Sequence, residues 1–286
     1  MSEPLVSIAL PLFGDHRAVQ TLPAIARAWL RQQVPCEVVV AVTEGTRLPD
    51  LGDAAGGGRV RIIPAPRDST SPGLLRNLAA GQSRAPVLYL GDADIAPLGD
   101  DFLDRALPLL DDRAVIQPWM YRLVNAADAL DAPPFDPPAG DRACHVTAGP
   151  DGVLTAVGGE RFTALDPELT VVDSTEGDSW RTPDGDAWRP VPFHWGGALV
   201  RRSTFDAVGR YSARYLGWGG EDDDLIAKLD GRFGVVRAWK EHPRLACLHF
   251  EHPRTHTVAG NVEDNRVILT QRLAAGVDAM IEEDLV

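Results

Sequence analysis

Short apolar runs alternate with amphipathic stretches over the first 120 residues of the chain. The apolar runs are "LVSIALPLF" (5–13), "CEVVVAV" (36–42), "VRIIPA" (60–65) and "APVLYLGD" (85–92). Most of them are apolar on both faces, which is typical of buried strands in a parallel sheet. The stretches 16–31 and 72–83 instead repeat apolar positions at helical spacing. This alternation predicts right-handed βαβ units and an open α/β sheet.

The pattern changes between residues 124 and 192. Segments such as "DAPPFDPPAGD" and "DSTEGDSWRTPDGDAWRP" are rich in Pro, Asp and Gly and carry little periodicity, which predicts a loop-dominated insert. Long ordered loops in compact domains are often lids or substrate walls, although an insert without a catalytic role is an open alternative. Beyond it we expect an acidic helix after "GWGG", strands near "VVRAW" and "LACLHF", and a C-terminal helix over 262–281.

Composition and charge narrow the range of partners. The chain has 286 residues with 28 Lys and Arg against 41 Asp and Glu, a net charge of −13. Nucleic acid is therefore excluded as a partner, because phosphate backbones require clustered basic residues. Cys36, Cys144 and Cys247 lack metal-site spacing and predict reduced thiols in a cytoplasmic protein. We see no secretory signal and no transmembrane segment, while peripheral contact with a membrane stays open.

Two aspartates, Asp92 and Asp94, directly follow the apolar strand "VLYL". Ligands of open α/β sheets gather at the carboxyl ends of strands, and residues two apart in an extended segment face the same way. Both carboxylates can then approach one cation, and hard oxygen ligands suit Mg²⁺ or Mn²⁺. The D-x-D pattern is common in turns and is a weak signal by itself. The prediction of a cation site therefore depends on its position directly after a buried strand.

Four acidic residues open the helix in "GWGGEDDD" (217–224). Asp222 lies at helical spacing from the apolar positions and is expected on the inward face, where a carboxylate is costly unless it is hydrogen-bonded or functional. Asp223 falls toward the flank, and Asp224 is expected to form an exposed pair with Lys228. A solvated acidic turn at the positive end of a helix explains those two residues. The apolar positions of the helix, from which the spacing of Asp222 is counted, are Leu225, Ile226 and Leu229.

Three histidines, His249, His252 and His256, lie within eight residues in "LHFEHPRTH". Together with the D-x-D they suggest shared metal ligation. If the strand continued through His252, His249 and His252 would face opposite sides. A turn before Pro253 would bring both toward one ion, and the sequence leaves the two arrangements open.

Several motifs resemble GT-A-fold, family-2-type glycosyltransferases. They are "SIALPLF", "SPGLLRNLAAG", "YLGDAD", "FHWGGALVRRSTFDAVGRYS" and "YLGWGGEDDDL". The C-terminal part is similar to the β-1,4-galactosyltransferase and chondroitin-polymerase group, whose hallmark is G-W-G-G-E-D followed by a metal-binding histidine. The likeness spans residues 6–94 and 193–254.

The resemblance implies a Rossmann-like nucleotide-diphospho-sugar transferase fold, with a mostly parallel sheet flanked by helices. We expect one domain over residues 1–286. Its parts would be a nucleotide-sugar-binding half (1–120), the loop-rich insert (124–192), an acceptor and catalytic half (193–256) and a C-terminal helix (257–286).

The resemblance also implies roles for the metal-binding residues. Asp94 matches the carboxylate that ligates Mn²⁺, and Asp92 matches a contact to the donor ribose or to the metal shell. His252 falls where the family places its histidine ligand. His249 stands where galactosyltransferases often have a methionine ligand, a departure that would admit Mg²⁺ as well.

Four residues resemble donor contacts. Pro11 and Glu44 follow the pattern of nucleoside contacts at the ends of the first two strands, with Glu44 in place of a commoner aspartate. Arg76 and Asn77 in "LLRN" resemble the pair near the uracil and diphosphate.

The acceptor side rests on the acidic motif and on two tryptophans. Asp222 matches the catalytic base, and Glu221 matches the residue that orients the acceptor, with Asp223 beside it. Trp218 and Trp195 are candidate platforms for sugar faces, since aromatic rings pack well on apolar C–H surfaces. Trp195 is equally compatible with a place in the core.

The implied function is metal-dependent, inverting transfer of a sugar from a UDP-hexose or UDP-N-acetylhexosamine to an acceptor hydroxyl. The sequence does not name the acceptor: a glycan, a glycolipid, a natural product and a peptide all stay open. Crowding by Glu221 and Asp223 is expected to make Asp222 more basic. Three alternatives stay open: a retaining N-acetylgalactosaminyltransferase-like enzyme, a nucleotidylyltransferase, and a non-catalytic sugar-nucleotide-binding protein.

Overall fold

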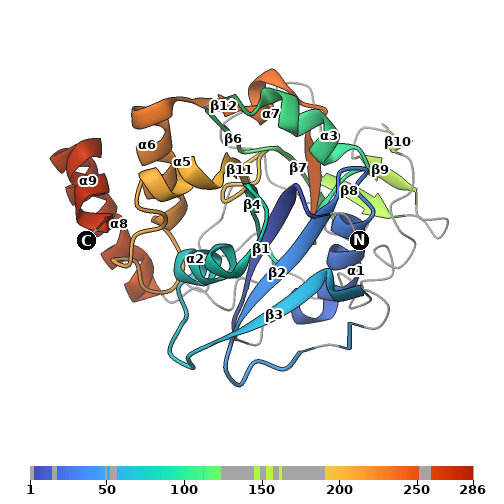
Figure 1. Ribbon diagram of the computed structural model, residues 1–286, viewed down its shortest axis with the longest axis horizontal. Coiled ribbons are helices and arrows are strands. Elements are labelled where there is room, and N and C mark those ends of the chain that lie inside the picture. Colours follow the sequence, from blue (N-terminus) through green and yellow to red (C-terminus); the bar gives the residue numbers. More distant parts are fainter. Residues whose placement is uncertain are drawn as a thin grey trace.

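The computed structural model describes residues 3–14, 18–48, 50–51, 57–111, 113–123, 145–148, 153–156, 161–162, 191–250 and 259–285. Within them, a central sheet runs in the order β12 (Val235–Arg237), β6 (Ala114–Ile116), β11 (Ala198–Arg201), β4 (Val87–Leu90), β1 (Val6–Leu12), β2 (Cys36–Thr43) and β3 (Val60–Ala65) (Figure 1). The pairs β1–β2, β1–β4, β2–β3 and β6–β12 are parallel, and β11 is antiparallel to both neighbours. The predicted mostly parallel α/β sheet is confirmed.

Helices cover both faces of this sheet. Along β1, Val6, Ile8 and Leu10 share one core cluster with α1 (Ala18–Leu30). Ala9, on the opposite face, joins a second cluster with α2 (Pro72–Gln82). Successive side chains of a strand point to opposite faces, so a strand with helices on both sides is buried on both faces. This explains why the first strands lack a polar face.

A second sheet lies beside the first. Its order is β10 (Arg161–Phe162), β9 (Leu154–Ala156), β8 (His145–Ala148), β7 (Trp119–Leu123), β13 (Ala246–Phe250) and β5 (Ile95–Pro97). The strand predicted in "LACLHF" is β13, whose His249 is paired in register with Ile95. This pairing brings the late histidine segment next to the residues that follow the D-x-D. Most of the predicted insert lies outside the described residues.

The C-terminal part packs against the acidic helix. That helix is α6 (Glu221–Phe233), and Figure 1 shows α8 (Ala259–Ala275) and α9 (Val277–Asp284) beside it at one end of the molecule. The prediction of one helix over 262–281 was wrong, because Gly276 adopts a positive φ of 93° and separates α8 from α9. Shorter helices are α3 (Phe102–Ala106), a 3₁₀ turn (Leu107–Leu109), α5 (Arg202–Ala207) and α7 (Ala238–Glu241).

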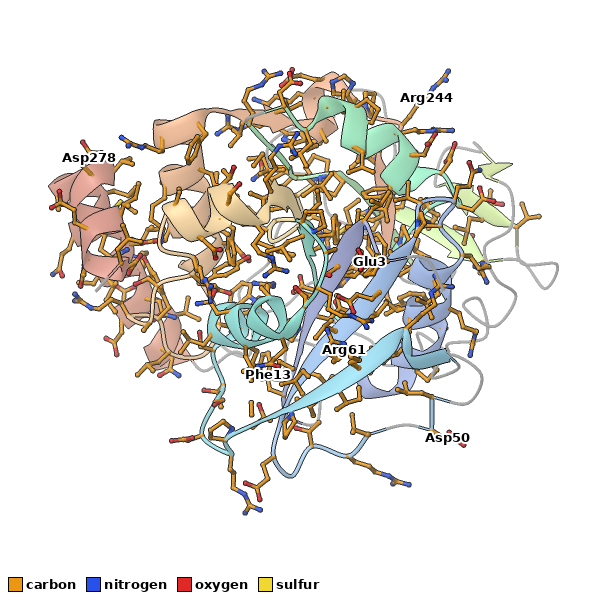
Figure 2. All side chains as sticks on the ribbon, viewed as in Figure 1. Glu3, Phe13, Asp50, Arg61, Arg244 and Asp278 are labelled. Carbon is orange, nitrogen blue, oxygen red and sulfur yellow. The ribbon has the colours of Figure 1, made fainter. Side chains whose placement is uncertain are left out.

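Charged side chains such as Arg244 and Asp278 extend from the periphery of the molecule (Figure 2). None of the described helices combines the length and the apolar character that a membrane span requires. Cys36 and Cys247 are free and buried, whereas Cys144 lies outside the described residues.

Candidate active site

A cavity of about 550 Å³ opens at the carboxyl ends of β1 and β4. Segments that are far apart in the sequence meet in its wall: the end of β1, the D-x-D, the start of α6, and strands β7 and β13. The predicted site residues among those lining it are Pro11, Arg76, Asp92, Asp94, Trp195, Trp218, Glu221, Asp222, Asp223 and His249. The D-x-D and Asp222 therefore face one space.

Both carboxylate oxygens of Asp92 accept hydrogen bonds. The buried guanidinium of Arg76 donates to Oδ1, and Nε2 of His194 donates to Oδ2 over 2.9 Å. Nδ1 of His194 lies 3.3 Å from the Tyr89 hydroxyl. Burial by itself would raise the pKa of Asp92, but Arg76 and His194 outweigh it and hold that pKa below its usual range. Asp92 is thus a fixed, ionised hydrogen-bond acceptor.

Asp94 lies beside His249, with 3.5 Å between Asp94 Oδ2 and His249 Nε2. Both residues line the cavity, and Asp94 is buried. Within the described part of the chain, no group of three or more His, Cys, Asp or Glu side chains is arranged to hold a metal ion. His252, the predicted histidine ligand, and His256 lie outside the described residues. One carboxylate and one imidazole are nevertheless donors that suit Mn²⁺.

Asp222 faces the cavity and is held through one oxygen. Arg76 Nη1 (3.0 Å) and the Tyr211 hydroxyl (3.1 Å) both donate to its Oδ1. Its pKa is raised, with burial as the largest cause and the charge of Asp92 adding to it, while Arg76 opposes the shift. The sequence predicted that the pKa of Asp222 is raised, and the direction agrees. Burial, however, outweighs crowding by neighbouring carboxylates as the cause.

The packed face of α6 differs from the predicted one. It consists of Glu221, Asp224, Leu225, Lys228 and Leu229, all buried. Asp222 lies next to that face, and its side chain stays 16% exposed toward the cavity. The spacing to the apolar residues predicted that Asp222 faces inward. The side chain does face inward, but toward the cavity and not into the core.

Asp224 and Lys228 correct another prediction, because the expected exposed pair is completely buried. Asp224 accepts hydrogen bonds from Arg272 Nε (2.6 Å) and from the Tyr215 hydroxyl (2.9 Å). Lys228 donates to the backbone oxygen of Arg210 over 2.6 Å. A solvated acidic turn cannot account for this arrangement, since a buried charge requires partners of this kind.

The two remaining acids of the motif, Glu221 and Asp223, also line the cavity. Glu221 accepts a hydrogen bond from the backbone N–H of Gly219 (2.9 Å), and burial, followed by the charge of Asp222, raises its pKa to about 8. Asp223 accepts from the indole N–H of Trp195 (2.9 Å), and burial raises its pKa to about 6. Trp195 is 40% exposed, so it is not a core residue, and Trp218 is 37% exposed.

Two predicted donor contacts lie elsewhere. Glu44 is exposed just beyond β2 and is not among the described residues that line the cavity. Asn77 exchanges two hydrogen bonds with the backbone of Tyr211, donating over 2.9 Å and accepting over 3.1 Å, and so ties α2 to that segment. Arg76 does line the cavity, but its described hydrogen bonds go to Asp92, Asp222 and the Gly91 carbonyl.

Three residues around the site were not predicted as site residues: His194 and Arg122 line the cavity, and Tyr211 contacts Asp222 from behind it. His194 is buried in the "FHWGG" motif, which was quoted for the resemblance without a role for the histidine. Tyr211 lies in "GRYS", where nothing in the sequence pairs it with Asp222. Arg122 on β7 is buried and lines the cavity. Its strand "WMYRL" reads as a core strand with a single charge, so the pattern gave no signal.

Residues 190–252 match the family model described as the N-terminal domain of galactosyltransferase. This segment contains His194, Trp218, the acidic start of α6 and His249. The resemblance predicted from the motifs is confirmed over this part of the chain, and the description of the family model agrees with the predicted enzyme class, a glycosyltransferase. No curated protein matches the sequence.

Solved glycosyltransferase structures align at low identity. The mannosyltransferase PcManGT from Pyrobaculum calidifontis, in complex with GDP-Man and Mn²⁺, is 14% identical with a TM-score of 0.47; the alignment covers 89% of this chain and 59% of that chain. The catalytic domain of Drosophila β1,4-galactosyltransferase 7, in complex with xylobiose, is 17% identical with a TM-score of 0.42, covering 91% of this chain and 79% of that one.

Proposed function

We propose that the chain is a metal-dependent, inverting glycosyltransferase that moves a sugar from a UDP-hexose or UDP-N-acetylhexosamine to an acceptor hydroxyl. The observation that supports this best is that Asp222, with its raised pKa, faces the same cavity as the Asp92 and Asp94 carboxylates. A nucleotide-sugar site and a proton acceptor for an incoming hydroxyl are thereby combined in one space.

Asp94 and His249 are the described residues that would hold Mn²⁺ or Mg²⁺, with His252 as a further predicted ligand. A divalent ion supplies positive charge that offsets the negative charge growing on the leaving diphosphate. Asp92 contributes differently. Arg76 and His194 each bind one of its oxygens and fix its orientation, and each oxygen keeps a lone pair for a hydrogen bond from a hydroxyl group of the donor, the role that we assign to it. Pro11, at the end of β1, would border the nucleoside.

Asp222 would act as the general base. In the transfer, the acceptor oxygen forms a bond to the anomeric carbon while the bond from that carbon to the diphosphate oxygen breaks, and the diphosphate leaves with the electron pair. The acceptor's proton moves to the Asp222 carboxylate, a step that typically contributes about 10²–10⁴-fold. A carboxylate with a raised pKa suits this task because its basicity lies nearer to neutral pH.

The acceptor would bind on the α6 side of the cavity. The half-exposed rings of Trp195 and Trp218 offer apolar faces to a sugar, and Asp223 holds the Trp195 indole in place. Glu221 holds the glycine-rich turn before α6 through the Gly219 N–H. These contacts are compatible with a glycan, a glycolipid, a glycosylated natural product or a peptide.

Asp222→Asn tests the proposed function. We expect UDP release from UDP-galactose, UDP-glucose, their N-acetylated forms or UDP-glucuronic acid, with Mn²⁺, to fall by at least about 10²-fold for whichever donor is used. Donor binding should persist, because the side-chain shape is retained. Asp230→Asn, on an exposed turn of the same helix, is the matched control. Turnover by Asp222→Asn close to that of the control would remove Asp222 as the base. A product with the donor's anomeric configuration would favour the retaining alternative.

A further inference from the structure

Two tyrosines four residues apart bind two aspartates that lie two residues apart on α6. The Tyr211 hydroxyl donates to Asp222 Oδ1 (3.1 Å), and the Tyr215 hydroxyl donates to Asp224 Oδ2 (2.9 Å). The chemistry of the two contacts is the same, but their surroundings differ. Asp222 faces the cavity, whereas Asp224 is completely buried with Arg272.

The position of the Tyr211 hydroxyl is fixed from several sides. The side chain is buried, and its ring meets Phe205 edge-on with 6.0 Å between ring centroids. The Arg76 guanidinium carbon lies 5.3 Å from the ring centroid. Asn77 binds both the N–H and the C=O of residue 211. A Cβ at position 73 would lie 2.9 Å from the ring, so Gly73 allows this close packing.

The two oxygens of Asp222 are in different situations. Oδ1 accepts from both Tyr211 and Arg76, while no described residue donates a hydrogen bond to Oδ2. Position 196, next to Asp222, is a glycine, and a Cβ there would lie 2.9 Å from Oδ2. The carboxylate is therefore held by one oxygen, and the other is left for a substrate hydroxyl.

We propose that Tyr211 is a positioning residue, which together with Arg76 fixes Asp222 so that Oδ2 takes the acceptor's proton. This inference rests on the proposed function, because it requires Asp222 to act as the base. Tyr211 acts through Asp222 and does not itself touch the reacting atoms.

The Tyr211 hydroxyl also affects the ionisation of Asp222. Its hydrogen bond stabilises the carboxylate and so lowers the pKa of Asp222, against the larger effect of burial. Removing the hydroxyl must then raise that pKa and leave less carboxylate at acidic pH. The other charged or titratable groups around Asp222 are Arg76 from α2, Asp92 after β4, His194 before β11, and Glu221 and Asp223 on α6.

Tyr211→Phe tests the proposal, with UDP release from the active donor as the readout. We expect the acid limb of kcat to move to higher pH by about one unit, since one hydrogen bond to a carboxylate corresponds to a shift of roughly this size. On that limb kcat should fall by up to about tenfold. The KM for the donor should stay the same, because the Tyr211 hydroxyl contacts Asp222, the proposed base, and not the donor.

Tyr215→Phe is the matched control. It loses the same hydroxyl from a carboxylate on the same helix, so we expect a lower Tm and an unchanged acid limb. Should Tyr211→Phe fail to fold, 3-fluorotyrosine at position 211 keeps the ring and makes the hydroxyl a stronger donor. The acid limb should then move to lower pH.

The outcomes separate the two proposals. A wild-type chain that releases UDP from none of the donors overturns the proposed function and this inference with it. An active wild type whose acid limb is the same in the Tyr211 variants overturns the inference alone. Equal shifts in Tyr211→Phe and Tyr215→Phe also overturn it, because the effect would then follow general stability.

Discussion

Gly196 illustrates how the smallest residue sets the geometry of the charged side chains around it. A Cβ at this position would lie 2.8 Å from Arg76 Nη2 and 2.9 Å from Asp222 Oδ2. Both are ends of side chains, but Arg76 Nη2 binds Asp92 and the Asp222 carboxylate is held through its other oxygen, so a methyl group would have to displace the network that orients the carboxylate. Glycine is needed here for the close approach, and its own φ is not in the positive range.

Gly196→Ala should therefore lower turnover while the chain still folds. We expect kcat to fall by about 10–10²-fold, since small displacements of a catalytic group have effects of this order. Gly81→Ala, within α2, is the control, because a Cβ there meets only Arg210 Nη1 at 3.9 Å. It should leave kcat unchanged and stabilise the helix by about 0.5–1 kcal/mol. UDP release and Tm measured for both variants check the prediction, and equal kcat values in the two would contradict it.

Helix α6 connects the cavity to the C-terminal helices. One side carries Asp222 toward the cavity, and the other carries Asp224 and Lys228 into a buried network with Arg272 of α8 and Asp284 of α9. The same α8 also reaches the turn that precedes α6. There the buried Asn265 donates to the carbonyl oxygens of Leu216 (2.9 Å) and Trp218 (3.2 Å) and accepts from the Leu216 N–H (3.3 Å). The C-terminal helices thus brace both the start of α6 and the loop of Trp218.

Arg272→Met should reduce the free energy of unfolding by about 3 kcal/mol or more, because it leaves Asp224 and Asp284 buried with less compensation. Arg266→Met, earlier on the same helix, removes an exposed arginine paired with Glu263. It should leave the free energy of unfolding unchanged within the error of a denaturant titration. Similar losses in the two variants would show that the buried network does not hold the helices together.

Much of the central architecture could be predicted at the scale of the whole molecule. The strands that became β1 and β2 are buried along their full length, so apolar runs identified them reliably. The second sheet could not be predicted, because β13 gains its role from β5 and β7, strands more than a hundred residues earlier in the chain. The break at Gly276 was missed because an isolated glycine within a helical pattern is also tolerated inside a helix.

The site could be predicted only in part, because several of its residues gain their contacts from segments that are far away in the sequence. That Asp94 and Asp222 lie at a cavity could be predicted from local context, one after a buried strand and the other in a specific motif. The burial of Asp224 could not be seen, because its partner Arg272 lies 48 residues away, and local spacing offered Lys228 as a solvent-exposed partner instead. His194 and Tyr211 likewise gain their roles only when the fold brings them to Asp92 and Asp222.

A ligand in the cavity should stabilise the whole molecule, because the wall combines strands of both sheets with α6. Binding to the folded state alone contributes about 2.7 kcal/mol at a ligand concentration of 100 Kd. We therefore expect UDP with Mn²⁺ to raise Tm by several degrees, and EDTA to return it to the value with UDP alone.

Asp94→Asn should keep the shift caused by UDP alone and lose the part that depends on Mn²⁺, since Asp94 is one of the two described candidate ligands. Asp100→Asn, at an exposed position in the turn after β5, should behave like the wild type. An equal Mn²⁺-dependent shift in Asp94→Asn and Asp100→Asn would exclude Asp94 from the metal site.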